Sequence, residues 1–532
     1  MEKWIEMFGE DAVSRQLELE ARYKVIGQEA TRRAYEQART EDGGVIRTSL
    51  GQKVLGHQFK AVNEGVKTFI ESCLKPHRGT KPSYVLIVED ISKIYSERQE
   101  QLFEIITLTV FSVLLNGVLR KNCQHSNLCQ TIAKELYDEV KLQAFLNNHE
   151  GKAKSVLSGL EKRVQALYRR AYALARMEHE KFAFTEWNKQ DAMQLAASLI
   201  QVVLKVSSYF EEYKHDNLLE IQPSQSLLDG WNKNEEKIID SSYRLCPTIL
   251  PPRPWENYMD GGYYGELQST SKLLRVHRQQ DVFTKSYMST LNQLELEGVR
   301  KAINAIQSTP WVINKEVLAV LQELVKRGGG IAGIPNLKES VPPSVLPPNY
   351  TDEQLKAHKK KLAGWYRSET RRKSICLRAL TNIRTAEEFK DYERIYFPCN
   401  MDFRGRVYPI PSFNFQGDDV NKSLILFADA PACEEEKCWD WLLIEGANLA
   451  GVDKVSYDDR KQWVLDNEQS ILMSAEEPLG NLWWAEQDSP CQFLAWCFEY
   501  KKAKEYIKEH GSIIGFTTGI NVAFDGTCSG LI

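Results

Sequence analysis

A carboxylate followed by small residues is the feature of this sequence that points most directly to chemistry. Asp525 is followed by the run GTCSG at 526–530, and Ile520, Val522 and Phe524 precede it at alternate positions. The alternation predicts a strand with one apolar face, with Asp525 at its end on the other face. Because magnesium prefers carboxylate oxygens, this pattern predicts a metal-binding carboxylate on the floor of a cleft.

A second candidate is the segment 402–408 (DFRGRVY), in which Arg404 and Arg406 flank Gly405. Glycine lets the backbone approach a ligand closely, and arginine offers forked donors that match phosphate oxygens. The pattern is therefore compatible with phosphate binding. A hairpin turn with a surface ion pair to Asp402 explains the same residues, and both interpretations stay open at this point.

Positive charge gathers on the segment 356–378, which carries nine lysines and arginines and one acid, Glu369. The cations are Lys356, Lys359, Lys360, Lys361, Arg367, Arg371, Arg372, Lys373 and Arg378. A helix with a stripe of one sign is suited to follow a sugar-phosphate backbone, because binding releases the counterions of the nucleic acid. The alternative is an ordinary solvated helix face.

A short loop at 75–82 (KPHRGTKP) is also basic. It presents Lys75, His77, Arg78 and Lys81 around one glycine and two prolines. Basic arms of this kind enter the minor groove of A·T-rich DNA. An ordinary exposed loop would have the same composition.

Two further pairs of residues receive structural interpretations. Asp418 and Asp419 follow a glutamine and a glycine, which predicts a polar turn. Trp483 and Trp484 are expected in a hydrophobic core rather than on a stacking surface.

Helices must position most of these candidates. Residues 10–225 read as mostly helical, because apolar residues recur at spacings of three and four. Within them, 102–119 is apolar enough for a membrane span, but its setting among amphipathic helices favours a buried core helix. The proline-rich run 246–255 (CPTILPPRPW) excludes a regular helix there.

The second half of the sequence alternates between order and breaks. Residues 291–326 are predicted to be helical, and 352–390 to form one or two long charged helices. Between them, the glycines at 328–330 and several prolines predict a flexible linker. The glycine run lacks the Gly-Lys-Ser/Thr ending of a phosphate-binding loop. From 393 onward strands and helices mix.

Composition restricts the class of protein. The 532 residues exceed one core and predict about three domains. A net charge of -4 gives no bulk attraction to nucleic acid, so any such contact must come from local basic patches. The eleven cysteines form no Cys-x-x-Cys pair, and the first ten residues carry no apolar signal segment, so a reducing cytosol is expected.

Several motifs, taken together, resemble the single-subunit DNA-directed RNA polymerases of T-odd-type bacteriophages and mitochondria, and most of all the phage branch. The three main motifs lie at 402–408, 483–490 and 524–530. Further similar segments are 251–255, 314–320 and 446–455. The resemblance runs in order from about residue 10 to residue 531 and is weakest before residue 240.

The resemblance implies a right-hand polymerase architecture that is mainly α with a small α+β part. Residues 1–325 would form a helical promoter-binding domain. Residues 326–395 would form a linker and the thumb, and 396–532 the start of the palm, with the fingers and the rest of the palm not on this sequence.

The resemblance also assigns catalytic roles. Asp525 matches the first palm aspartate that binds magnesium, with the carbonyl of Gly526 as a further ligand. Two Mg²⁺ ions roughly 4 Å apart would activate the RNA 3′-hydroxyl and support the pyrophosphate leaving group. Gly530 stands where related DNA polymerases place a glutamate, so it leaves space for the 2′-hydroxyl of ribonucleoside triphosphates and disfavours a DNA polymerase.

Nucleic-acid contacts follow from the same resemblance. Arg406 would hold the template strand and the RNA–DNA hybrid, with Arg404 and Tyr408 as supporting contacts. The thumb residues expected to grip the hybrid are Arg371, Arg372, Lys373 and Arg378. The loop from Arg78 to Lys81 would read an A·T-rich stretch of double-stranded promoter DNA, and a strand-opening hairpin is expected within 212–235.

The sequence departs from the family pattern after Leu531, where the family continues with Gln-His. The second palm aspartate, the nucleotide-selecting helix and the promoter specificity loop are not on it. We therefore expect the chain alone not to polymerise RNA, and a complementary C-terminal chain or an interrupted gene to supply the rest. The alternative is a non-catalytic promoter- or DNA-binding fragment. Either would act in the cytoplasm of the bacterial host, without a membrane.

Overall fold

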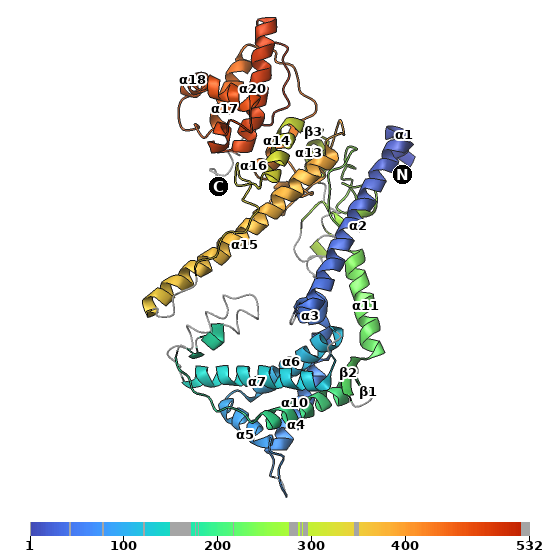
Figure 1. Cartoon of the computed structure of the whole chain (residues 1–532). Coiled ribbons are helices and arrows are strands. Elements are labelled where there is room, and N and C mark those ends of the chain that lie inside the picture. Colours follow the sequence, from blue (N-terminus) through green and yellow to red (C-terminus); the bar gives the residue numbers. More distant parts are fainter. Residues whose placement is uncertain are drawn as a thin grey trace. The chain divides into compact units, whose positions relative to one another are not determined.

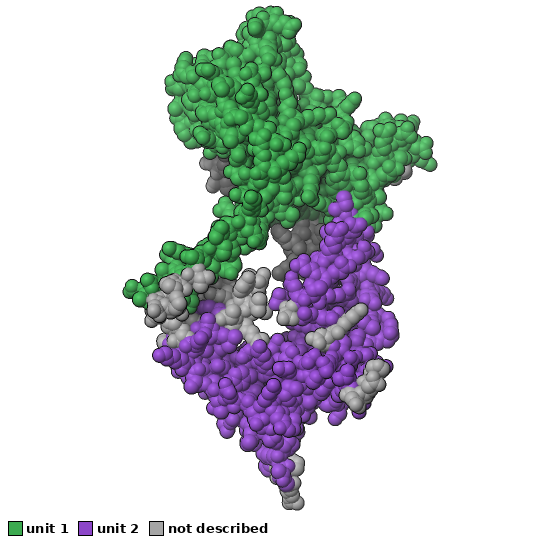
Figure 2. All heavy atoms as spheres, in the orientation of Figure 1, with its two compact units in different colours: residues 1–25, 243–532 green, residues 26–242 purple. Residues whose placement is uncertain are grey.

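The computed structural model describes residues 2–41, 44–76, 79–120, 123–148, 172–175, 177–178, 180–215, 218–275, 286–287, 290, 296–344 and 351–522. Four residues with predicted roles, Asp525, Gly526, Gly530 and Arg78, therefore lie outside the described residues. The chain forms two compact units, which Figure 2 distinguishes by colour. Unit 1 consists of residues 1–25 and 243–532, and unit 2 of residues 26–242.

Unit 2 is built mainly from helices (Figure 1). They are the later part of α2 (Glu10–Thr40), α3 (Gly44–Arg47), α4 (Ser49–Leu74), α5 (Val85–Ile94), α6 (Gln99–Leu119), α7 (His125–Asn148), α10 (Lys189–Val206) and α11 (Gln225–Asp240). They confirm the prediction that residues 10–225 are mostly helical, for the described residues of this range.

Helix α6 is the core of unit 2. It is apolar around its circumference, and α3, α4 and α7 pack against it. Val110, Phe111 and Leu114 are fully buried. The helix is long and apolar enough to cross a membrane, but most of it is covered by the surrounding helices. The prediction of a buried core helix is confirmed.

One antiparallel hairpin lies in unit 2, formed by β1 (Phe210–His215) and β2 (Leu218–Pro223). Its register pairs Phe210 with Pro223 and His215 with Leu218. The hairpin overlaps the window 212–235 in which the resemblance places a strand-opening hairpin. That role stays a prediction.

Unit 1 contains more varied elements. In chain order they are α1 (Glu2–Phe8), the start of α2, η1 (Glu266–Thr270), α13 (Glu297–Gln307), β3 (Trp311–Ile313), α14 (Lys315–Lys326), α15 (Asp352–Phe389), β4 (Cys399–Met401), β5 (Val407–Pro409), α16 (Asp419–Ser423), β6 (Ile425–Phe427), α17 (Lys437–Leu449), α18 (Tyr457–Asp466), α19 (Glu468–Glu476), η2 (Trp483–Glu486) and α20 (Pro490–His510). β3 pairs with β6 and β4 with β5, both antiparallel. The predicted fold class, mainly α with a small α+β part, is confirmed.

Helix α20 forms the centre of the core of unit 1. Trp496 and Tyr500 on this helix are fully buried, and α16, α17, α19 and η2 pack around it. Trp484 is also fully buried, and its indole N–H donates to the carbonyl of Pro478 at 2.8 Å. Trp483 packs beside this core, so the core interpretation of both tryptophans is confirmed.

The prediction of continuous helix over 291–326 is wrong in its middle. Helix α13 ends at Gln307, and β3 separates it from α14. Proline at 310 cannot donate the backbone hydrogen bond that a helix would need. The backbone instead turns into β3, whose Trp311 stacks on Phe427 of β6 with ring centroids 4.3 Å apart.

The prediction of a flexible linker at the glycine run is also wrong. Gly328, Gly329 and Gly330 all adopt positive φ, which glycine permits at low cost. They fold the chain back after α14, and the Gly329 N–H donates to the carbonyl of Leu324 at 2.9 Å. Ile334, just beyond, is buried in the core of unit 1. The glycines therefore make an ordered helix end.

The pair Asp418 and Asp419 is more than the polar turn that its composition predicts. Asp418 caps α16 by accepting the N–H of Asn421. Asp419 accepts the backbone N–H groups of Cys491 at 2.7 Å and Gln492 at 3.0 Å. These are in the first turn of α20, where N–H groups lack partners within the helix. Asp419 thus caps the central helix from 72 residues away in sequence.

We predict that Asp419→Ala weakens the protection of α20 against hydrogen exchange by about 2 kcal/mol, because it removes a cap and leaves two N–H groups without an acceptor. Hydrogen exchange with mass spectrometry on peptides from 490–510 measures this. Asp458→Ala, at an exposed position in the first turn of α18, is the matched control. Equal protection in both variants would refute the capping role.

Candidate nucleic-acid interface

The segment 402–408 forms the turn of the β4–β5 hairpin, and the Asp402 carboxylate organises it. One carboxylate oxygen accepts the backbone N–H of Arg404 at 2.9 Å and that of Arg406 at 3.1 Å. The other accepts the Arg404 guanidinium at 2.6 and 2.8 Å and the Tyr408 hydroxyl at 3.2 Å. Gly405 has φ +83°, which lets the chain reverse within this turn.

The two arginines of this turn differ in whether their charge is paired. Asp402 is only 9% exposed; burial alone would raise its pKa, but the hydrogen bonds from Arg404 and from the backbone N–H of Arg406 outweigh it and lower the pKa to about 2. The Arg404 side chain is committed to this carboxylate. The Arg406 guanidinium is exposed and has no partner among the described residues. The ion-pair interpretation is thus confirmed for Arg404, and Arg406 remains available to a ligand.

Two features around the turn were not predicted from the sequence. Arg275 stacks its guanidinium on the Tyr408 ring, 4.9 Å from the ring centroid, because its backbone N–H donates to Met401 of β4. Phe403 at the tip of the turn is 78% exposed. Nothing local in the sequence marks Arg275, since the contact joins segments more than 120 residues apart.

A hollow of about 600 Å³ lies in unit 1 near this hairpin. Its lining residues are Ile306, Thr309, Trp311, Phe415, Gln416, Lys422, Phe427, Asn521 and Val522. Trp311, stacked on Phe415 at 5.0 Å, forms an aromatic wall, and Lys422 supplies a cation. The Gln416 side chain donates to the carbonyl of Val407 at 3.1 Å, which ties the hollow to the hairpin.

The described part of the segment leading to Asp525 lines the same hollow. Phe427 of β6 donates its N–H to the Gly519 carbonyl at 2.7 Å, and the Asn521 amide donates to the carbonyls of Lys422 and Ile425 at 3.2 and 3.1 Å. Residues 520–522 are anchored but do not form a strand, so the strand prediction is wrong for them. The Asn521 side chain bonds one carbonyl of α16 and one of β6.

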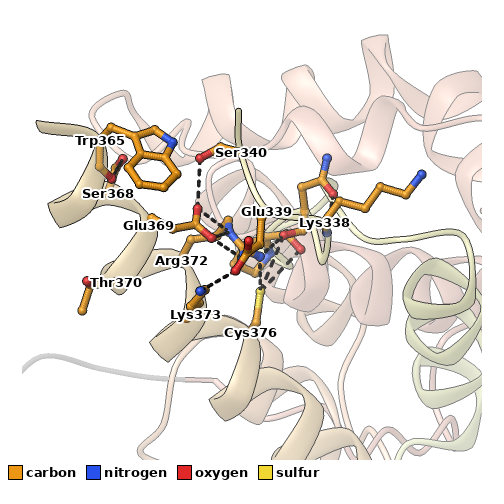
Figure 3. Close-up of polar contacts among 12 residues, drawn as sticks. Lys338, Glu339, Ser340, Trp365, Ser368, Glu369, Thr370, Arg372, Lys373 and Cys376 are labelled. Carbon is orange, nitrogen blue, oxygen red and sulfur yellow. Dashed lines mark hydrogen bonds and ion pairs between the residues drawn. The ribbon is translucent and has the colours of Figure 1, made fainter. Parts of the chain in front are cut away.

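Helix α15 carries the predicted thumb cations, and it is one continuous helix, as one of the two predicted alternatives has it. Thr351 and Gln354 form a capping box at its start. Arg372 is only 14% exposed and pairs with Glu369 (Figure 3). Lys373 pairs with Glu339 at 2.5 Å.

Of the other two residues predicted to lie on the thumb, one is in an ion pair and one is not. Arg378 pairs with Asp418 at 2.9 Å. Arg371 is exposed and has no ion-pair partner among the described residues. Of the four residues assigned to hybrid binding, only Arg371 therefore presents an uncommitted charge.

Further cations that have no carboxylate partner among the described residues share the face of Arg371, although the Nε–H of Arg367 donates to the backbone carbonyl of Ala363 at 3.3 Å. Lys356, Lys360, Arg367 and Arg371 are spaced by four, seven and four residues, which places them on one side of the helix. All four are exposed, and the row is about 22 Å long at 1.5 Å per residue. We call these four residues the basic stripe. Its length suits several consecutive phosphates of a nucleic-acid backbone.

In unit 2, the predicted promoter loop is only partly described. Lys81 pairs with Glu89 of α5 at 2.9 Å, so its charge is shared within the protein. Arg78 lies outside the described residues. The promoter-reading role of this loop stays a prediction.

Metal binding rests on residues that the structure does not describe. Within the described ranges, no group of three or more His, Cys, Asp or Glu side chains is arranged to hold a metal ion. The predicted ligands Asp525 and Gly526 fall outside those ranges. The magnesium site stays a prediction.

Comparison with known proteins identifies similar sequences. Residues 15–308 match the family model described as DNA-directed RNA polymerase N-terminal, and residues 433–532 match the one described as DNA-dependent RNA polymerase. The DNA-directed RNA polymerase of Enterobacteria phage T3 is 34% identical over 357 residues, covering 66% of this chain and 39% of that protein.

Two other phage proteins match more of the chain. The DNA-directed RNA polymerase of Enterobacteria phage K11 is 30% identical, covering 83% of this chain and 49% of that protein. T7 RNA polymerase of Escherichia phage T7 is 28% identical, covering 98% of this chain and 58% of that protein. The chain thus spans about half the length of these relatives.

We predict that Arg406→Gln lowers the slope of log K against log[salt] for binding an RNA–DNA hybrid by about 0.7 to 0.9, the loss of one phosphate contact. The double variant Asp402→Asn/Arg404→Gln is the matched comparison and should leave the slope unchanged, because it removes a neutral ion pair and leaves no buried carboxylate without a cation. Fluorescence anisotropy titrations between 50 and about 300 mM salt measure both slopes. A slope change for Asp402→Asn/Arg404→Gln as large as that for Arg406→Gln would contradict this assignment.

Proposed function

We propose, since this chain belongs to the DNA-directed RNA polymerase family, that it carries the promoter-, template- and hybrid-binding part of a phage-type transcription enzyme. The strongest support is the order of the two family matches, over 15–308 and 433–532, which follows the order of the motifs along the sequence. The phage relatives support placing this activity in the cytoplasm of an infected bacterium.

The proposed binding surface is the basic stripe of α15 together with the turn of the β4–β5 hairpin. The stripe offers a row of uncommitted cations, and the turn offers Arg406 on a backbone that Asp402 holds rigidly. Phosphates position a nucleic acid without reading its sequence, so this surface would bind the hybrid at any transcribed position. An RNA polymerase needs such sequence-independent contacts during elongation.

The proposed chemistry is nucleotidyl transfer at Asp525, with the carbonyl of Gly526 beside it. Bound Mg²⁺ would lower the barrier by activating the RNA 3′-hydroxyl and stabilising the pyrophosphate leaving group. The chain's own contribution on the described residues is to anchor the approach to Asp525, through Asn521 and the Gly519 carbonyl. Gly530 would admit the 2′-hydroxyl of a ribonucleoside triphosphate.

Two-metal chemistry requires a second carboxylate in addition to Asp525. The chain spans about half the length of the phage polymerases that it matches. We propose that the residues described here bind nucleic acid, and that extension of RNA also needs the rest of the polymerase, whether joined to them or supplied as a complementing chain. The second candidate, a non-catalytic promoter-binding fragment, shares the binding surface but has no complementing chain.

A primer-extension assay tests the proposal. The chain is given a labelled RNA primer on a DNA template, Mg²⁺ and ribonucleoside triphosphates, with and without the C-terminal part of a phage relative's polymerase. We expect binding by the chain alone and extension only in the mixture. Binding without extension in either case would favour the non-catalytic fragment, and extension by the chain alone would overturn the requirement for a second carboxylate.

We predict that Asp525→Asn abolishes extension in the complemented mixture, by about 10³-fold or more, while hybrid binding changes less than about threefold, because the carboxylate serves the reaction and the stripe serves binding. Asp466→Asn, at the exposed end of α18, is the matched control and should retain full extension. Extension by Asp525→Asn at the rate of this control would remove Asp525 from the reaction.

A further inference from the structure

The ion pair between Glu369 and Arg372 of α15 is largely covered by protein, and its contacts point to a role other than binding the hybrid. The Glu369 carboxylate accepts the Arg372 guanidinium at 2.5, 2.9 and 3.0 Å and the Ser340 hydroxyl at 3.0 Å (Figure 3). The remaining guanidinium nitrogen of Arg372 donates to the carbonyl of Asn336 at 2.5 Å. Each nitrogen of the guanidinium therefore has a protein acceptor.

The pair holds a separate stretch of chain, residues 336–340, against the helix. Asn336 and Ser340 contact Arg372 and Glu369, and Glu339 pairs with Lys373. We call residues 336–340 the strap. It follows the ordered glycine turn that ends α14, so the strap is fixed at both its origin and its contact with α15.

Burial makes this contact costly to disturb. Glu369 is 5% exposed, and the guanidinium of Arg372, followed by the Ser340 hydroxyl, holds the pKa of Glu369 at about 2 against the effect of burial. Removing the partner of a buried charge is strongly destabilising. A phosphate that drew Arg372 away would leave Glu369 as such a charge, so Arg372 is poorly suited to contact the hybrid.

The position of the pair along α15 lets it affect where the basic stripe lies. From Glu353 to Ser368 no residue of the helix is fully buried, although the Trp365 indole nitrogen is covered, and Glu369 is the first fully buried residue. Lys356, at the far end of the basic stripe, lies 16 residues before Arg372, which is about 24 Å at 1.5 Å per residue. A bend of about 10° at the strap would move Lys356 by about 4 Å, more than the roughly 3.4 Å between successive nucleotides of a strand.

We propose that Arg372 is a positioning residue that clamps the strap to α15 and so sets the direction of the basic stripe, and that it does not contact nucleic acid itself. The proposal rests on the proposed function for the identity of the ligand, an RNA–DNA hybrid. The clamp itself rests only on the contacts within unit 1.

Two readouts on one set of variants test this. The first is hydrogen exchange of peptides covering 336–344 and 353–368 in the full chain. The second is the salt dependence of binding to an RNA–DNA hybrid. The variants are Arg372→Gln, the double variant Glu369→Gln/Arg372→Gln, which leaves no buried unpaired charge, and the neighbouring Arg371→Gln as control.

Both Arg372 variants are expected to speed exchange in 336–344 by about tenfold or more and to weaken hybrid binding several-fold, with an unchanged salt slope. Arg371→Gln is expected to leave exchange unchanged and to lower the slope by about 0.7 to 0.9, because it removes one phosphate contact. If Arg372→Gln lowers the slope as Arg371→Gln does, Arg372 contacts the phosphates and the proposal falls.

The exchange readout separates this proposal from the proposed function. Unchanged exchange at 336–344 in both Arg372 variants would overturn the clamp, whatever the binding result. A chain that shows no hybrid binding before mutation would overturn the proposed function, and the exchange of 336–344 would still decide whether Arg372 clamps the strap.

Discussion

The pairing of arginines with nearby carboxylates is the interaction on which the candidate interface depends. Asp402 forms an ion pair with Arg404, and Glu369 forms one with Arg372. Both carboxylates are almost fully buried. A covered carboxylate needs its cation, since an unpaired charge without water is far less stable. These pairs therefore hold backbone in place, and the cations left over, such as Arg406, are the ones that a phosphate can bind without breaking protein contacts.

Carboxylates also hold elements together at the centre of unit 1. Asp419 spans 72 residues of sequence to cap α20, and its neighbour Asp418 pairs with Arg378 of α15. Adjacent carboxylates thus connect the long cationic helix with the helix around which the core forms. From the sequence alone, both acidic side chains would be expected on the surface. In the structure they join α16 to α20 and to α15.

Much of this follows from the sequence, and the exceptions have physical causes. Periodicity predicted the long helices and the buried α6, and motif order predicted the polymerase family. Composition could not tell which cations are paired, because Glu369 and Arg372 are close in sequence but the strap that covers them is about 30 residues away. The glycines at 328–330 indicated flexibility, whereas positive φ at a helix end uses the same residues for order. Arg275 had no local signal at all.

The most direct test is to observe the arginine side chains themselves while nucleic acid binds. In protein labelled with ¹⁵N at arginine, the Nε–H resonances report each guanidinium separately during titration with an RNA–DNA hybrid. The account predicts large shifts for Arg371 and Arg406, and small ones for Arg372 and Arg404, whose Nε–H groups donate to carboxylates. Shifts of equal size in the paired and the uncommitted arginines would contradict the division of charge on which the interface is built.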